Sequence, residues 1–211
     1  MTPLINFFWE NVIYTIPAII IYIICKMVYF KKKNIKPNAY REFVLFVFFL
    51  YMAVLFSQTI TLPKTEYLLF RGFTWDEYSS YIPAFREGNL VPFKTIQQYF
   101  IGENPEGEKV GTLINLFNVI MLVPFGILLP FTFKKFRRWY YTIPCGLALV
   151  VFIEVMQYFV RRVPDIDDAI LNFIGVIIGY ILWLIFKAFE DKFEKMMNAF
   201  FEKIKKKKSK A

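Results

Sequence analysis

The residues whose types could do chemistry are concentrated in one stretch, Phe152–Gly179, at the junction of two very apolar segments. Carboxylates and arginines in this setting could transfer protons, bind a phosphate or carboxylate group, or pair with one another. A carboxylate at the centre of a membrane helix costs roughly 2.5–3.5 kcal/mol on insertion scales, so it usually has a partner and often a function. We therefore take this stretch as the candidate functional centre. Its polar residues are Glu154, Gln157, Arg161, Arg162, Asp165, Asp167, Asp168 and Asn172.

The composition of the chain argues against several other kinds of chemistry. The absence of histidine removes the commonest general base and the commonest metal ligand. Cys25 and Cys145 both lie inside apolar runs, so they predict neither a disulfide framework nor a zinc site. No glycine-rich phosphate loop or nucleophile elbow is present. We expect no cofactor and no metal, with a divalent cation at Asp165–Asp168 as the less favoured alternative.

The apolar runs predict an all-α membrane protein, a bundle of about five transmembrane helices. Of the 211 residues, 57% are hydrophobic, and several runs reach the roughly 20 residues that cross a bilayer. A long extracellular loop is expected over 63–110 and a cytoplasmic tail over 187–211, all within a single domain, 1–211. The predicted spans cover residues 12–30, 43–62, 112–133, 139–160 and 168–186.

Two segments outside the spans have patterns of their own. In the extracellular loop, Phe93–Phe100 carries apolar residues at helical spacing after Pro92, which predicts a short helix on the membrane surface. The residues Gly102–Gly111 are predicted to form a solvated loop. In the tail, a helical stripe of apolar residues starts at Phe189 and the chain ends in KIKKKKSK. This pattern predicts an amphipathic basic helix against anionic inner-leaflet lipids.

The distribution of positive charge predicts the orientation in the membrane. Lys26, the loops after the first and third spans, and the tail together hold 19 of the 26 lysines and arginines. The positive-inside bias then places the N-terminus outside the plasma membrane and the C-terminus in the cytoplasm. Because topology and lipid contact account for the net charge of +9, we expect no nucleic-acid partner.

This orientation brings polar side chains from four predicted spans to one depth. At a rise of 1.5 Å per residue, Glu154 and Asn172 lie roughly 6–9 Å below the outer surface. Asn115 and Asn118 enter the third span at about the same depth, and Gln58 lies near the outer end of the second. The polar residues therefore converge in the outer leaflet.

Two interpretations of this convergence remain. In one, the three aspartates cap the fifth span, and Glu154 pairs with a nearby arginine or asparagine. In the other, the residues form a functional pocket, which we favour because so many polar groups exceed what capping requires. Gly175 and Gly179 form a GxxxG step that lets another helix approach closely.

Four motifs resemble the VanZ-like family of bacterial membrane proteins over about Asn89 to Gly179. They are NLVPFKTI (Asn89–Ile96), NLFNVIMLVPFGILLP (Asn115–Pro130), the E-x-x-Q of Glu154 and Gln157, and the R…D-x-D-D…N-x-x-G-x-x-x-G run Arg161–Gly179. The resemblance implies an envelope role, and the family's name comes from a protein that gives resistance to teicoplanin-type lipoglycopeptides.

The leading hypothesis is a protein that acts at the outer leaflet on a lipid-linked cell-wall precursor or a lipoglycopeptide. Cationic side chains would meet phosphate or carboxylate, and the aromatic loop Phe73–Phe100 would cover the site. The candidate ligand-binding residues are Lys94, Asn115, Asn118, Glu154, Gln157, Arg161, Arg162, Asp165, Asp168 and Asn172.

Two other classes of function stay open. In an enzyme, Glu154 and a second carboxylate, Asp165 or Asp168, would perform acid–base chemistry on a lipid headgroup. A lipid transporter or flippase is the second alternative, although the polar residues crowd one leaflet and no inverted repeat is visible. The sequence leaves open the identity of the ligand, whether a reaction occurs, and the oligomeric state.

Overall fold

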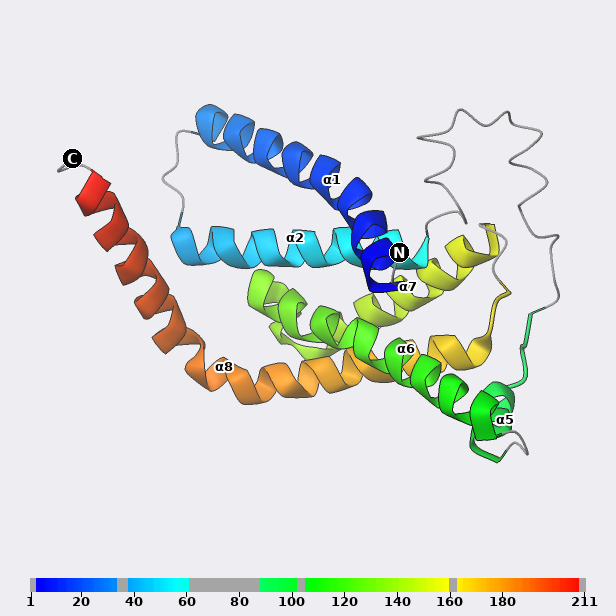
Figure 1. Cartoon of the computed structure of the whole chain (residues 1–211). Coiled ribbons are helices and arrows are strands. Elements are labelled where there is room, and N and C mark those ends of the chain that lie inside the picture. The colour runs from blue at the N-terminus through cyan, green and yellow to red at the C-terminus, as the bar shows by residue number, and fades with distance from the viewer. Residues whose placement is uncertain (1–2, 34–37, 61–87, 102–104, 160–162, 209–211) are drawn as a thin grey trace, which may run out of the picture.

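All the regular elements that the structure describes are helices. In this computed structural model the described residues are 3–33, 38–60, 88–101, 105–159 and 163–208. Figure 1 shows α6, α7 and α8 crossing one another, with α1 and α2 paired beside them. The helices are α1 (Pro3–Lys33), α2 (Ala39–Thr59), α5 (Lys94–Ile101), α6 (Pro105–Thr132), the short 3-10 helix η1 (Lys134–Arg137), α7 (Trp139–Phe159) and α8 (Ile166–Lys208).

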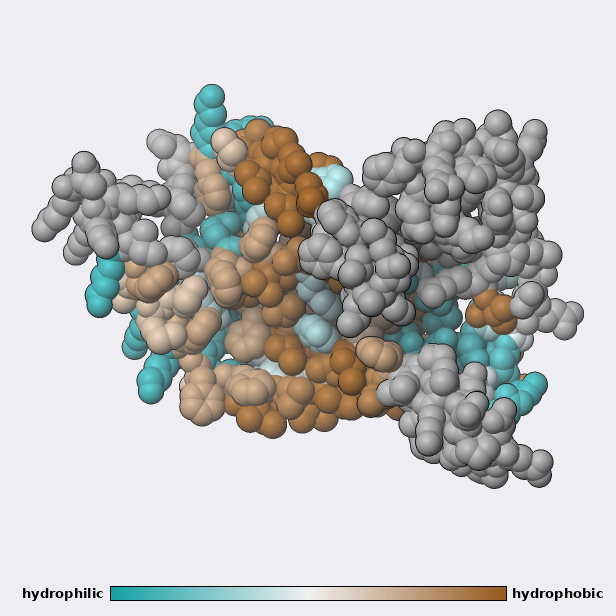
Figure 2. Space-filling model, viewed as in Figure 1, coloured by the Kyte–Doolittle hydropathy of each residue, from teal (hydrophilic) through white to brown (hydrophobic). Residues whose placement is uncertain are grey.

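Four helices in the described part of the chain are long and apolar enough to cross a membrane. They match the second to fifth predicted spans, so the predicted all-α membrane protein is confirmed. The first predicted span, 12–30, falls within α1, which is not one of these four, so the number of five spans stays a prediction. Figure 2 shows hydrophobic side chains over the middle of the molecule and hydrophilic ones toward its two ends.

The core of the bundle is small, and much of the apolar surface faces outward. Leu122, Ile153 and Val176, from α6, α7 and α8, are completely buried at the centre. By contrast, the exposed fraction reaches 60% for Ile21 and 66% for Phe117. Apolar exposure on this scale is costly in water and is expected for a surface that contacts lipid.

The closest helix packing joins α6 to α8 through three glycines. A Cβ atom on Gly175 would overlap the Val119 carbonyl oxygen, and a Cβ atom on Gly179 would overlap the Val123 carbonyl oxygen. On α6, Gly126 fits against the backbone of α8. The two helices therefore run in the same direction where they cross, and the predicted GxxxG step is their contact surface.

Two boundaries differ from the predictions. The expectation that Gly102–Gly111 forms a loop is wrong from Pro105 onward, where α6 already begins. Proline suits the first helical position because the backbone N–H that it lacks would have no partner inside the helix there. The fifth span and the tail helix are one continuous element, α8, which begins two residues before the predicted Asp168. Figure 1 shows its last turns changing direction.

Hydrogen bonds hold the tight turn between α6 and α7. The Tyr180 hydroxyl donates to the Arg137 carbonyl at 2.9 Å, and the Thr142 hydroxyl donates to the Phe136 carbonyl. The Arg137 guanidinium pairs with Glu190 of α8 at 2.5 Å. Both η1 and the start of α7 are thereby fixed against α8. We call this end of the bundle the basic end, defined by Lys134–Arg138.

Candidate functional site

At the opposite end of the bundle, the segment that precedes α5 lies alongside the start of α8. The Asn89 amide donates to the Pro164 carbonyl at 3.0 Å, and the Ile166 amide donates to the Asn89 carbonyl at 2.9 Å. A Cβ atom on Gly88 would lie 2.5 Å from the Pro164 carbonyl oxygen, so a glycine is needed for this close approach. Two stretches about 75 residues apart are thus joined through their backbones.

Asp167 caps α5 although it belongs to α8. Its side chain is fully buried, and its Oδ1 atom accepts a hydrogen bond from the Phe93 amide at 2.5 Å. Its Oδ2 atom accepts from the Thr95 amide at 2.8 Å and from the Ile96 amide at 3.1 Å. These amides belong to the start of α5, where backbone donors lack partners inside the helix. Phe93 has a positive φ of 64°, which turns the chain into α5.

Asp165 connects the same two segments through side chains. Its Oδ1 atom accepts from Asn89 Nδ2 at 3.0 Å and from the Asp167 amide at 2.9 Å. Its Oδ2 atom accepts from the Thr95 hydroxyl at 2.6 Å. Asp165 therefore caps α8 and also bonds to the loop that leads into α5. We call Asn89, Thr95, Asp165 and Asp167 the carboxylate clamp.

The third aspartate, Asp168, lies in a different environment. Its Oδ1 atom accepts a hydrogen bond from Asn118 Nδ2 of α6 at 2.5 Å. Where α6 packs against α8, Gly126 lies opposite Gly179 and Leu122 lies opposite Gly175. The same offset between the two helices places Asn115 near the level of Asp168. On α7, Gly146 contacts Val176 of α8. Because α7 runs in the opposite direction to α8, Glu154, which follows Gly146 by eight residues, lies near the level of Asp168, which precedes Val176 by eight. Four predicted site residues from three helices therefore lie in one layer: Asn115, Asn118, Glu154 and Asp168.

Two asparagines in this region carry buried polar atoms that no described residue satisfies. Asn115 is 6% exposed and Asn172 is 2% exposed. The amide nitrogen of Asn115 and the carbonyl oxygen of Asn172 have no hydrogen-bond partner in the described part of the chain. Buried polar groups normally have partners, so these two atoms require a water, an ion, a ligand or a residue outside the described ranges. We call Asn115, Asn118, Glu154, Asp168 and Asn172 the polar layer.

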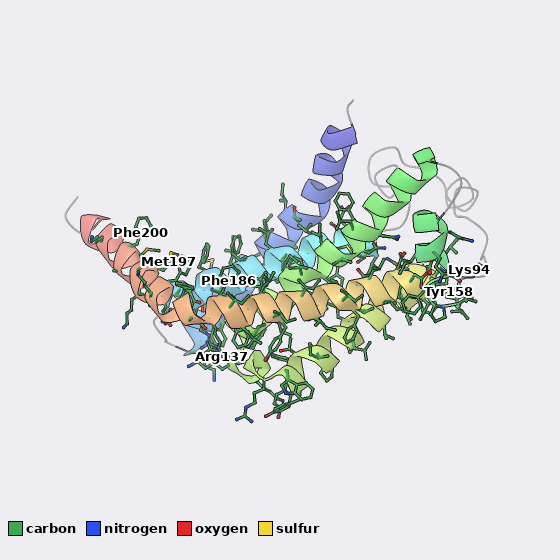
Figure 3. All side chains as sticks on the ribbon, turned by 90° about the horizontal axis from the view of Figure 1, so that it is seen from below. Lys94, Arg137, Tyr158, Phe186, Met197 and Phe200 are labelled. Carbon is green, nitrogen blue, oxygen red and sulfur yellow. The ribbon has the colours of Figure 1, made fainter. Side chains whose placement is uncertain are left out.

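The other predicted site residues are not part of the polar layer or lie outside the described residues. Gln157 is half-buried on α7, and Lys94 is exposed at the first position of α5. Figure 3 shows Lys94 and Tyr158 at the same end of the bundle. Arg161, Arg162 and the aromatic segment 73–87 lie outside the described residues. Within the described ranges, no group of three or more histidines, cysteines, aspartates or glutamates could hold a metal ion.

Asn89 and Thr95 were missed as partners of the aspartates. Both belong to the NLVPFKTI motif, but nothing in a sequence states that this motif contacts residues 165–167. One local signal existed, because an asparagine shortly before a proline often forms a side-chain turn. The structure has that turn, with the Val91 amide donating to Asn89 Oδ1 at 3.1 Å.

Replacing Asn118 by alanine is expected to destabilise the contact between α6 and α8 by about 1 kcal/mol. Hydrogen bonds between membrane helices contribute on average about 0.6 kcal/mol and at most about 1.7 kcal/mol, and this one goes to a carboxylate. Unfolding in mixed micelles measures the change, with Asp168→Asn and the double variant completing a mutant cycle. A coupling energy of zero would show that the bond contributes nothing.

Comparison with known proteins identifies the family. A model of the VanZ/LLP1 family matches residues 43–187, which is more than half of the chain and includes both the carboxylate clamp and the polar layer. No curated protein and no solved structure matches the chain. The family match agrees with the four motifs, two of which meet in the clamp. This chain is therefore a membrane protein that belongs to the VanZ/LLP1 family.

Proposed function

We propose that this protein acts at the outer leaflet on a lipid-linked cell-wall precursor or a lipoglycopeptide, and so modulates teicoplanin-type resistance. The observation that carries the proposal is the polar layer, with its unsatisfied atoms on Asn115 and Asn172 inside an apolar bundle. Such groups are costly next to lipid and commonly mark a ligand site. Membership in the VanZ/LLP1 family supports the same class of role.

In this proposal the clamp positions a cation for the ligand. The amides of Phe93 and Thr95, the two neighbours of Lys94, donate hydrogen bonds to the Asp167 carboxylate. The backbone of Lys94 is therefore fixed relative to α8 while its side chain stays exposed. A lysine in this position supplies a point charge for a phosphate or carboxylate at the membrane surface. The asparagines of the polar layer would orient the ligand through neutral hydrogen bonds.

The alternative of an enzyme now has a narrower set of candidate residues. Asp165 and Asp167 each accept three hydrogen bonds in the clamp, which leaves less capacity for proton transfer. Glu154 and Asp168 are the carboxylates in the polar layer, so they are the better candidates for an acid–base pair. The change Glu154→Gln separates the two functions, since catalysis would be lost whereas binding could survive.

Drug susceptibility of a sensitive host that expresses the protein tests the proposal. We expect the wild type to protect against a lipidated glycopeptide and not against a non-lipidated one. Asp168→Asn and Lys94→Gln should each lose most of this protection, because a hydrogen bond to a charged group contributes about 1.5–3 kcal/mol, roughly a tenfold or greater change in binding.

Lys187→Gln is the matched control for Lys94→Gln. It removes one exposed lysine from α8, far along the chain from the polar layer, where the Lys187 ammonium lies over the Trp183 ring. Protein levels in the membrane must be equal for all variants. If the wild type gives no protection, the resistance role is wrong for this chain. If all the variants protect equally, the polar layer is a structural network.

A further inference from the structure

A cavity of about 610 Å³ lies at the basic end, far from the polar layer. It is bounded by the start of α2, the end of α6, η1 and the part of α8 around Glu190. A volume of this size is typical of sites for small ligands or headgroups. Figure 3 shows Arg137, one of its lining residues, toward the end of the bundle opposite Lys94.

The charge of the cavity suits an anion. Its lining contains four cationic side chains and two carboxylates: Arg41, Lys134, Lys135 and Arg137 with Glu190 and Glu194. One cation is already paired, because Arg137 bonds to Glu190. Arg41, Lys134 and Lys135 are exposed, so they can approach a ligand without leaving a buried partner unpaired.

Arg137 adds a donor that lacks an acceptor. Its Nε atom is buried and has no hydrogen-bond partner in the described part of the chain. The arginine itself is held in place, since its carbonyl accepts from Tyr180 and its Nη2 atom bonds to Glu190. The Arg137 side chain is still 38% exposed, so its guanidinium can also meet a phosphate oxygen in the cavity.

Besides the charged residues, the cavity lining contains an apolar wall together with the polar side chains of Asn38 and Thr132. Val44 and Phe131 line the cavity, as does Phe133, which is 40% exposed and packs edge-on against Phe48 of α2. A free phosphate ion has no apolar group that could pack against this wall. A glycerophospholipid fits both features, because its phosphate can meet the cations while its acyl chains follow the apolar wall.

We propose that this cavity binds the headgroup of an anionic glycerophospholipid in the leaflet at the basic end. The site is separate from the polar layer and does not depend on the function proposed there. Basic pockets between transmembrane helices are a known way of holding such headgroups. Through Arg41 and η1 the lipid connects α2 to the turn between α6 and α7, which the Arg137–Glu190 ion pair joins to α8. It therefore stabilises the end of the bundle at which these helices meet.

Native mass spectrometry of the full chain in neutral detergent, titrated with phosphatidylglycerol, tests the proposal. We expect one tightly retained lipid per chain. The double variant Arg41→Gln/Lys134→Gln should bind it about 25-fold more weakly, since each basic residue near an anionic surface contributes roughly fivefold. Arg138→Gln/Lys187→Gln removes the same charge near the same end but from residues outside the cavity lining, and should change the affinity less than threefold.

Three outcomes would overturn the proposal. Equal weakening in both double variants would mean that lipid responds only to total charge. Equal retention of oleate, an anion without phosphate, would exclude recognition of the headgroup. Displacement of the lipid by millimolar inorganic phosphate would mean that the cavity is a site for a soluble anion. Because the readout is binding, a failed susceptibility experiment leaves this test unaffected.

Discussion

Replacing Gly175 by leucine is expected to separate α6 from α8 and to destabilise the bundle by about 3 kcal/mol or more. The physical reason is that any side chain at this position meets the Val119 carbonyl, a backbone atom that cannot rotate away. The contact between α6 and α8 must then open along its length, and Leu122 and Val176 become exposed. Unfolding in mixed micelles and the elution profile in mild detergent measure the effect.

Ala148→Leu is the matched control for this prediction. It makes the same kind of enlargement on α7 at an exposed position, so the added atoms face lipid and stability should change by less than about 0.5 kcal/mol. Gly179→Leu should behave like Gly175→Leu, since it meets the Val123 carbonyl. Normal stability in both glycine variants would contradict the close approach of the two helices.

Replacing Asp167 by alanine is expected to release α5 from α8 and to cost about 3 kcal/mol. The change removes the acceptor of three backbone amides and leaves those donors without a partner, at about 1–3 kcal/mol for each donor that water cannot reach. Hydrogen exchange at Phe93, Thr95 and Ile96 should become faster, while exchange in the middle of α6 stays slow. The measurement therefore separates a local release from general unfolding.

Two threonine variants test a smaller contribution to the carboxylate clamp and provide its control. Thr95→Val removes only the hydroxyl that bonds to Asp165 and should cost about 1 kcal/mol. Thr132→Val removes a hydroxyl that bonds to the Leu128 carbonyl of its own helix and should have little effect. Equal effects of the two changes would show that the hydroxyl contact in the clamp does not matter.

The features that were predicted from sequence are those that depend on local pattern. Apolar runs of the required length predicted the second to fifth spans, and helical spacing after Pro92 predicted α5. The GxxxG step at Gly175 and Gly179 predicted a helix contact, because only small residues allow such an approach. Each of these signals lies within one element, so no knowledge of a partner was needed.

The features that were not predicted depend on contacts between distant segments. The sequence shows three aspartates at the start of α8, and it left open whether they cap that helix or belong to a ligand pocket. The structure divides them: Asp165 caps α8, Asp167 caps α5, and Asp168 contacts α6. Neighbouring side chains on a helix point in different directions, and only the position of the other helices decides what each one meets.

Gly126 illustrates a second limit. The apolar run predicted a span over 112–133 that includes Pro124 and Pro130, two residues that usually interrupt helices, but it did not predict what Gly126 contacts. The structure has an unbroken α6 with Gly126 packed against the backbone of α8. In membrane helices such residues are tolerated because neighbouring helices satisfy the freed backbone groups.

The carboxylate clamp also constrains the order in which the protein can be made. Its hydrogen bond from Phe93 to Asp167 joins residues 74 positions apart, with α6 and α7 between them. During synthesis the earlier helices are inserted before α8 leaves the ribosome, so the segment before α5 has no partner until the last helix arrives. Closing the clamp is thus a late event in biogenesis. A chain that stalls before α8 leaves the amides of α5 uncapped, a defect that quality-control proteases in the membrane could detect.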